Sequence, residues 1–155
     1  MSRDVEFAKQ EIIAALIDSN TDVGDVLNPR VLQARVMNWN PKQVDALDTA
    51  SAALVAEGIL EVKETGHCLT AAGLEALYPP AGDFVREAIL RNFRASRARA
   101  GSVLNFRALA NESFSWNPKQ KRDFKPTLSR LEGEGIVERK GDNIHLTQLG
   151  YDEIY

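Results

Sequence analysis

The stretch LSRLEGEGIVERKGDNIHLTQLG, residues 128–150, decides the fold of this chain. Its first part is the end of an amphipathic helix, which Gly135 closes as a residue suited to a left-handed cap. IVERK (136–140) predicts a strand, GDN (141–143) a hairpin turn, and residues 144–147 the returning strand. LTQLG then begins a short last helix. The stretch therefore predicts a helix that is followed by a β-hairpin and another helix.

The chain contains this pattern twice, because shifting the sequence by 77 residues aligns it with itself without a gap. An internal repeat of this length indicates one structural module that is used twice. Three pairs of segments carry the alignment: WNPKQ (39–43) with WNPKQ (116–120), AEGILEVK (56–63) with GEGIVERK (133–140), and LTAAGLEALY (69–78) with LTQLGYDEIY (146–155).

The repeat predicts two domains, residues 1–78 and residues 83–155. PPAG (79–82) lies between them, and its two adjacent prolines cannot continue a helix. We therefore expect residues 79–82 to form a short, stiff linker.

The repeated WNPKQ is a signal for the start of a helix. Asn40 can accept hydrogen bonds from the first N–H groups of the helix, and Pro41 suits the first helical position because no donor is needed there. Gln43 occupies the capping-box position. An amphipathic helix opens each copy, and Asn28 or Asn105 starts a second one. The expected order in each copy is helix, short strand, helix, helix, hairpin, helix, which is a mainly α fold with small β-hairpins (α+β).

With residues 128–150 inside it, this order resembles the winged helix of MarR-like and PadR-like bacterial regulators. The resemblance covers nearly all of each copy. It implies that the third helix of a copy enters the major groove of DNA, while the hairpin, or wing, reaches the flanking backbone or the minor groove. Winged helices also serve as protein-binding modules, so the resemblance is more specific for the fold than for the function.

Both copies depart from this family in the length of the third helix. The segments from Asn40 to Gly58 and from Asn117 to Gly135 are each about one turn longer than the usual recognition helix. In the second copy, Pro126 lies inside this segment, lacks a hydrogen-bond donor and biases Lys125 away from helical geometry. We expect a kink or a new helix start at this proline.

Charge separates two copies that otherwise match. Residues 1–78 hold 6 Lys and Arg against 12 Asp and Glu, whereas residues 79–155 hold 13 against 10. The net charges are thus −6 and +3, which together give the −3 of the whole chain. A basic copy within an acidic protein favours nucleic acid as the partner of that copy alone.

Helical spacing directs Phe124, Leu128 and Leu131 of the second copy toward its core and leaves a basic outer face. Lysine and arginine on such a face bind phosphates and read base edges. Together with two cations of the expected wing, the candidate nucleic-acid-binding residues are Lys119, Lys121, Arg122, Lys125, Ser129, Arg130, Arg139 and Lys140. The alternative is a solvated basic face that nearby glutamates balance.

The same face of the first copy carries Asp45, Asp48 and Ala52, and two carboxylates there would repel phosphate. The third helix of this copy, ALDTASAALVAEG (46–58), has small or apolar residues around most of its circumference, which indicates burial against another surface. We therefore expect domain 1 to contact a protein, either in a homodimer or with a different partner.

Composition and a few single residues limit the functions and locations that we expect for this protein. The chain is 44% hydrophobic and 26% charged, has no apolar run near the ~18 residues that span a membrane, and begins with the charged MSRDVEFAKQ. With one cysteine, Cys68, it fits a reducing compartment, so the cytoplasm is expected. His67 and His145 do not align and have no further ligands around them. We expect no metal, no cofactor, no membrane partner and no enzymatic activity, because no catalytic constellation is present.

Two functions follow as expectations. The first is a DNA-binding protein, specifically a transcription regulator that acts by occupying its site, in which domain 2 contacts double-stranded DNA. The second is a non-enzymatic interaction subunit whose tandem winged helices bind other proteins. Bacterial chromosome-segregation complexes and eukaryotic endosomal sorting complexes use modules of this kind in that way.

Overall fold

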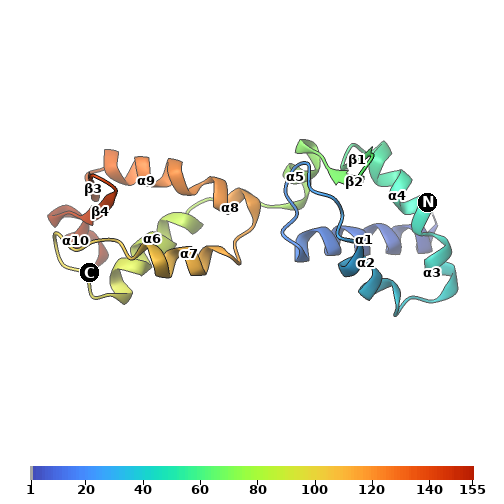
Figure 1. The fold of residues 1–155 in the computed structure, drawn as a ribbon, viewed down its shortest axis with the longest axis horizontal. Helices are drawn as coiled ribbons and strands as arrows, with labels where there is room; N and C mark the ends of the chain where they lie inside the picture. Colours follow the sequence, from blue (N-terminus) through green and yellow to red (C-terminus); the bar gives the residue numbers. More distant parts are fainter. Residues whose placement is uncertain (1) are drawn as a thin grey trace. The chain divides into compact units, whose positions relative to one another are not determined.

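The computed structural model describes residues 2–155, and the chain divides between Pro79 and Pro80 into two compact units. The first unit contains α1 (Arg3–Asp18), α2 (Pro29–Val36), α3 (Pro41–Asp45), α4 (Leu47–Ala56), β1 (Leu60–Lys63), β2 (Gly66–Leu69) and α5 (Ala71–Leu77) (Figure 1). The second unit contains α6 (Phe84–Ala95), α7 (Phe106–Ser113), α8 (Pro118–Arg122), α9 (Phe124–Gly133), β3 (Val137–Lys140), β4 (Asn143–Leu146) and α10 (Gln148–Ile154). The order of elements is the same in both.

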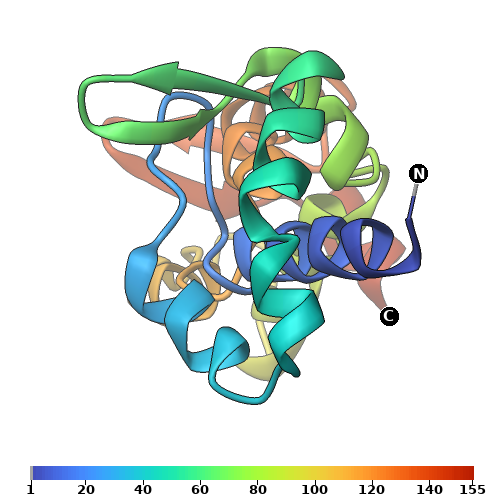
Figure 2. The same cartoon turned by 90° about the vertical axis from the view of Figure 1, so that its right-hand side faces the viewer.

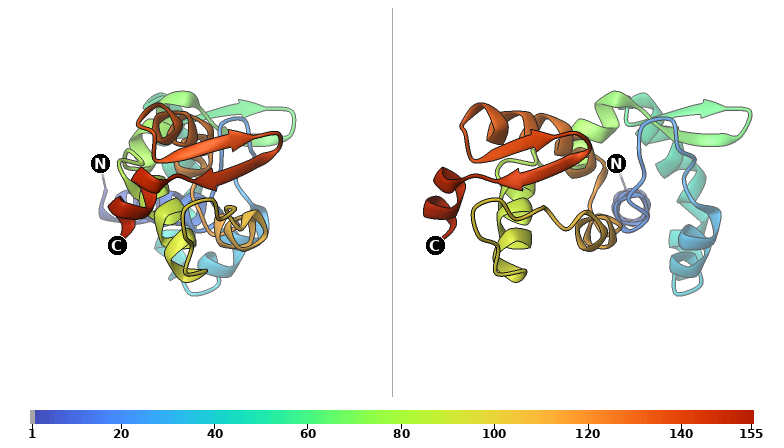
Figure 3. Two further views of the ribbon diagram at one scale, coloured as in Figure 1. Left: turned by 90° about the vertical axis from the view of Figure 1, so that its left-hand side faces the viewer. Right: turned by 60° about the vertical axis from the view of Figure 1, so that its left-hand side comes forward.

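Each unit consists of helices followed by an antiparallel two-stranded hairpin. Leu60 of β1 lies opposite Leu69 of β2, and β3 pairs with β4 in the same register. A short segment before the second helix pairs with the hairpin through Val26 and Cys68, an arrangement that recurs in the second unit. The hairpins extend beyond the helices, β1–β2 in Figure 2 and β3–β4 in Figure 3. The predicted fold class, mainly helical with two small hairpins in a repeated pattern, is confirmed.

The core of each unit forms where the opening helix meets the helix before the hairpin. Ile12 and Leu16 of α1 are fully buried and share a cluster with Leu54 of α4. The equivalent residues Ile89 and Phe93 of α6 share one with Leu131 of α9 in the second unit. Burying side chains of this size is the main source of stability in small units, so the repeat preserves the core positions themselves.

The two WNPKQ segments start helices as the sequence predicts. The side chain of Asn40 accepts a hydrogen bond from the Gln43 N–H at 2.9 Å, and the Gln43 side chain accepts one from the Asn40 N–H at 2.9 Å. Asn117 and Gln120 make the same reciprocal pair in the second unit. The tryptophans pack beside these caps, with Trp39 edge-on to Phe7 at a centroid distance of 5.5 Å. Both tryptophan side chains are buried.

The expected third helix is broken in both units. The second unit has a one-residue break at Asp123, so α9 begins at Phe124 and Pro126 falls in its first turn. A new helix start is therefore present near Pro126, but the proline is not needed for it, because the first unit breaks at the equivalent Ala46 without one. At both positions the backbone N–H donates to carbonyls three and four residues back, which tightens the end of the short helix.

The LTxxG motif joins the last helix to the hairpin. Thr147 caps α10 by accepting the Gly150 N–H at 2.9 Å, and its Oγ1 donates to the Ile136 carbonyl at 3.0 Å. A Cβ atom on Gly150 would lie 2.2 Å from that carbonyl oxygen and 2.6 Å from Leu146 Cδ1. Glycine is therefore the residue that lets α10 lie directly against the start of β3.

One ion pair lies at equivalent positions of the two units and joins the opening helix to the residue that follows the helix before the hairpin. Lys9 Nζ lies 2.6 Å from Glu57, and Arg86 at the same position of the repeat lies 2.5 Å from Glu134. These hydrogen bonds raise the pKa of both cations.

Between the first and second helices of each unit the signs are exchanged. Arg35 of α2 pairs with Glu11 and Asp18 of α1, whereas in the second unit Glu112 of α7 pairs with Arg91 of α6.

Tyr78 ties the end of the first unit to α1 and provides a test of its packing. Its hydroxyl is buried and donates to the Thr21 carbonyl at 2.9 Å and the Leu16 carbonyl at 3.3 Å. Burial, with smaller contributions from Asp22 and Asp25, raises the pKa of Tyr78 to about 12. Tyrosine in an unfolded chain has a pKa near 10, so the unfolded state loses its proton first and stability falls as pH rises from about 10 to about 12.

We expect Tyr78→Phe to lower the stability of the first unit by about 1–2 kcal/mol at neutral pH, because two carbonyls lose their donor. The variant should also show a weaker loss of stability above pH ~10. Urea unfolding at several pH values, monitored through a signal of the Trp39 indole, measures both effects. An equal alkaline loss in the variant and the parent would contradict this role of Tyr78.

No helix within residues 2–155 combines the length and the apolar character needed to cross a membrane.

Candidate nucleic-acid interface

The break at Asp123 places the candidate residues on two successive helices. Lys119, Lys121 and Arg122 lie on α8, which the Asn117 cap starts, and the other three helical candidates lie on α9. On α9 the expected orientation is confirmed for Leu128 and Leu131, which are buried, while Phe124 packs against the core in part. The candidates with exposed side chains are Lys121, Arg122, Lys125, Ser129 and Arg130, whereas Lys119 is half-buried.

Arg130 and Thr127 stabilise the junction between α8 and α9. Thr127 is buried, and its hydroxyl donates to the Asp123 carboxylate at 3.0 Å. Arg130 donates to the Thr127 hydroxyl at 2.9 Å and lies 3.3 Å from the Asp123 carboxylate. Arg130 thus has a structural role at the helix break, which the sequence alone did not indicate.

The two cations of the hairpin have carboxylate neighbours. Arg139 Nε lies 3.5 Å from Glu132 Oε2, and Lys140 Nζ lies 3.6 Å from Glu138 Oε1. All four side chains are largely exposed, and exposed ion pairs are weak and screened by salt. A phosphate could therefore replace either carboxylate at little cost.

Two of the helical cations are unengaged. Lys121 and Lys125 make no side-chain hydrogen bond or ion pair with any residue between 2 and 155. Their ammonium groups are available for an anion without the loss of an existing partner, which makes them the strongest candidates on this face.

The equivalent face of the first unit has the opposite character. Asp45 and Asp48 are exposed at the positions that Arg122 and Lys125 occupy in the second unit, and the position of Lys121 is taken by Val44. Two units with the same order of elements therefore present opposite charge at the same place. The carboxylates of the first unit would repel phosphate, as the sequence predicts.

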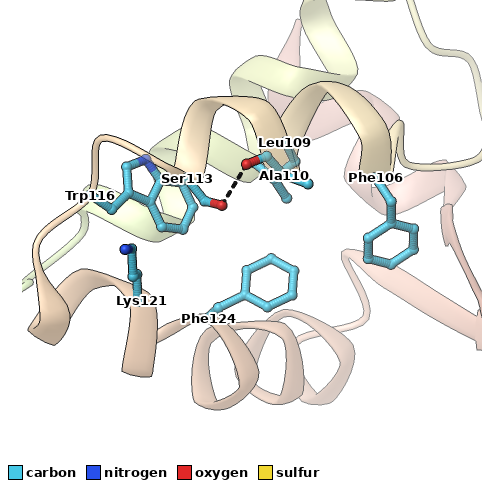
Figure 4. Close-up of a pocket in the computed structure, with 7 residues that line it drawn as sticks. All are labelled: Phe106, Leu109, Ala110, Ser113, Trp116, Lys121 and Phe124. Carbon is cyan, nitrogen blue, oxygen red and sulfur yellow. Dashed lines mark hydrogen bonds between the residues drawn. The ribbon is translucent and has the colours of Figure 1, made fainter.

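A pocket of about 230 Å³ opens between α7 and the α8–α9 pair. Figure 4 shows Phe106, Leu109 and Ser113 on α7 across from Phe124, with the Lys121 ammonium beside Trp116. The sequence alone does not indicate this pocket, because its lining comes from α7, Trp116 and the α8–α9 pair together.

Trp116 beside it is buried, and its Nε1 has no hydrogen-bond partner within residues 2–155. The equivalent Trp39 donates to Glu11 at 3.3 Å, and Ala88 stands at that position in the second unit. The difference between Glu11 and Ala88 is the one feature of the sequence that indicates the missing partner of Trp116.

The histidines and the cysteine all lie on the hairpin strands, His67 and Cys68 on β2 and His145 on β4. His145 Nδ1 lies 2.9 Å from the Gly101 carbonyl, as a strand histidine that fastens the short segment to the hairpin. Cys68 is buried. No group of three metal-ligating side chains occurs within residues 2–155.

Comparison of the chain with protein-family models, curated proteins and solved structures found no match.

Proposed function

We propose that each unit is a winged-helix module, that the second unit binds double-stranded DNA, and that the protein regulates transcription by occupying its site. The observation that carries this proposal is the contrast at the α8–α9 face. There the second unit has exposed and unengaged Lys121 and Lys125, while the first unit has Val44 and Asp48 at the same positions. This contrast favours an anionic partner for the second unit alone.

In this mechanism α8 and α9 approach the major groove and the β3–β4 hairpin reaches the neighbouring backbone. Lys119 and Lys121, with Arg139 and Lys140 of the hairpin, hold phosphates and set the register. Arg122, Lys125 and Ser129 face base edges. Arginine and lysine suit the acceptor atoms of guanine, and a serine hydroxyl can pair with donors or acceptors of any base. Bound protein then excludes other proteins from the same stretch of DNA.

The test is the salt dependence of binding. Four phosphate contacts predict that the logarithm of the association constant falls against the logarithm of salt with a slope of about −4. Fluorescence anisotropy with a labelled mixed-sequence duplex at several salt concentrations measures that slope. Absence of binding at low salt would reject the proposal.

A second candidate is a protein-docking subunit, which exposed apolar residues favour. Met37 and Phe114 occupy equivalent positions after the second helix of each unit, and each is 77% exposed. The small residues Ala52 and Ala56 are also exposed along α4. Heparin discriminates between the two functions, because a docking subunit with a pI of about 5.5 should pass through the column, whereas a clustered basic face should be retained.

A further inference from the structure

The helix α6 ends in a turn whose central residue is an arginine in the left-handed region. Arg97 has φ +54°, its N–H donates to the Arg94 carbonyl at 3.0 Å, and the Ala98 N–H donates to the Phe93 carbonyl at 2.9 Å. These two bonds define the Schellman motif, whose left-handed position is normally glycine and sometimes asparagine. Arginine has a Cβ atom that crowds the backbone there, so the residue is strained.

Three other helices end in the same motif with residues that suit it. The turn after α1 has Asn20 at φ +48°, the position equivalent to Arg97, and the turns after α4 and α9 have Gly58 and Gly135. The second unit therefore keeps an arginine where the repeat offers a better residue. Strain retained in this way points to a function of the side chain.

Arg97 belongs to a run of arginines that the first unit lacks. Arg91, Arg94, Arg97 and Arg99 stand where the first unit has Ala14, Ile17, Asn20 and Asp22. Arg91 pairs with Glu112, and Arg94 donates to the Ile154 carbonyl at 3.0 Å.

Arg97 and Arg99 are exposed, and their side chains have no hydrogen bond or ion pair within residues 2–155. The turn lies near α10, at the end of the second unit away from α8 (Figure 1).

We propose that Arg97 and Arg99 form a second phosphate-binding surface of the second unit, which contacts the backbone of DNA beyond the part that α8 and α9 hold. The planar guanidinium donates two parallel hydrogen bonds to phosphate and stays charged at all relevant pH values, which suits it to this role. This inference rests on the proposed DNA binding. It adds contacts that the hairpin and the two helices do not make.

The decisive variant is Arg97→Asn, because strain and binding predict opposite outcomes. Asparagine suits the left-handed position, so the melting temperature should rise by ~3 °C. One phosphate contact is lost, so DNA affinity should fall about three- to tenfold and the salt slope should become shallower by about 0.9. A more stable protein that binds DNA less well would support the proposal. Unchanged affinity and slope would overturn it.

Two further variants separate charge from strain. Arg99→Gln removes a charge at an ordinary backbone position, so its salt slope should fall by about 0.9 while its melting temperature stays the same. Arg30→Gln is the control in the first unit, where Arg30 is exposed at the start of α2, and its slope should match the parent. A parent protein that fails to bind DNA rejects both proposals, whereas binding that only the α8–α9 variants weaken rejects this one alone.

Discussion

Replacing Gly150 with alanine is expected to destabilise the second unit by about 3 kcal/mol. The added Cβ would lie 2.2 Å from the Ile136 carbonyl oxygen, and backbone atoms at the start of β3 cannot move away without disturbing the hairpin. The chain has one tryptophan in each unit, so the indole N–H signals of Trp39 and Trp116 in a thermal or urea series report on the units separately. The Trp116 signal should change at a lower temperature than in the parent.

Gly133→Ala is the matched control for this prediction. Gly133 also lies at a helical position, at the end of α9, but nothing is within 4 Å of a Cβ atom there. Alanine should leave the stability unchanged or increase it by up to about 1 kcal/mol, because it favours the helix more than glycine does. Gly73→Ala should reproduce the Gly150 effect in the first unit, since its Cβ would lie 2.3 Å from the Ile59 carbonyl oxygen. Equal effects at Gly133 and Gly150 would show that helix propensity, not the contact, determines the result.

Reversing the charge of Lys121 and Lys125 together should lower DNA affinity at least ~100-fold at moderate salt. In the proposed mode of binding, each substitution to glutamate would remove a phosphate or base contact and place a carboxylate against the backbone of DNA. Both residues are exposed and unengaged, so the variant should unfold at the temperature of the parent. Anisotropy with the same duplex measures the affinity, and circular dichroism checks the fold.

The control for charge reversal is Lys42→Glu with Lys63→Glu in the first unit. Both lysines are exposed, and the pair changes the net charge by the same amount. Affinity should fall only slightly, since long-range attraction between exposed charges is screened. If both double variants bind equally badly, the net charge controls binding and the division of roles between the units is wrong.

Much of the fold could be predicted because its signals are local. The Asn40–Gln43 and Asn117–Gln120 caps depend on residues three positions apart, and the hairpins depend on adjacent turn residues. The repeat also strengthens each prediction, because the same local pattern occurs in both copies. The left-handed position of Gly135 followed from the same local chemistry. These features need no knowledge of which distant segments come together.

The features that sequence reasoning missed depend on contacts between distant segments or on context. Pro126 indicated a break in the third helix, but the break at Ala46 has no local signal of that kind. The partners of Arg130 and the pocket beside Trp116 exist only when α7, α8 and α9 are packed. The sequence did not indicate the left-handed conformation of Arg97 either, because the end of α6 imposes it and arginine does not favour it. The basic face was found from the sequence because charge and helical spacing are both local.

The exchanged ion pairs between the first two helices of each unit bear on how the chain avoids misassembly during synthesis. Because the two units have matching cores, α1 could pack in the place of α6, or α2 in the place of α7. Such an exchange would bring Glu11 near Glu112 in one hybrid and Arg91 near Arg35 in the other. Like charges held together in partly desolvated contacts cost free energy, so each hybrid would be less stable than the native pairing. We therefore expect the sign reversal to favour the native helix pairs over both hybrids.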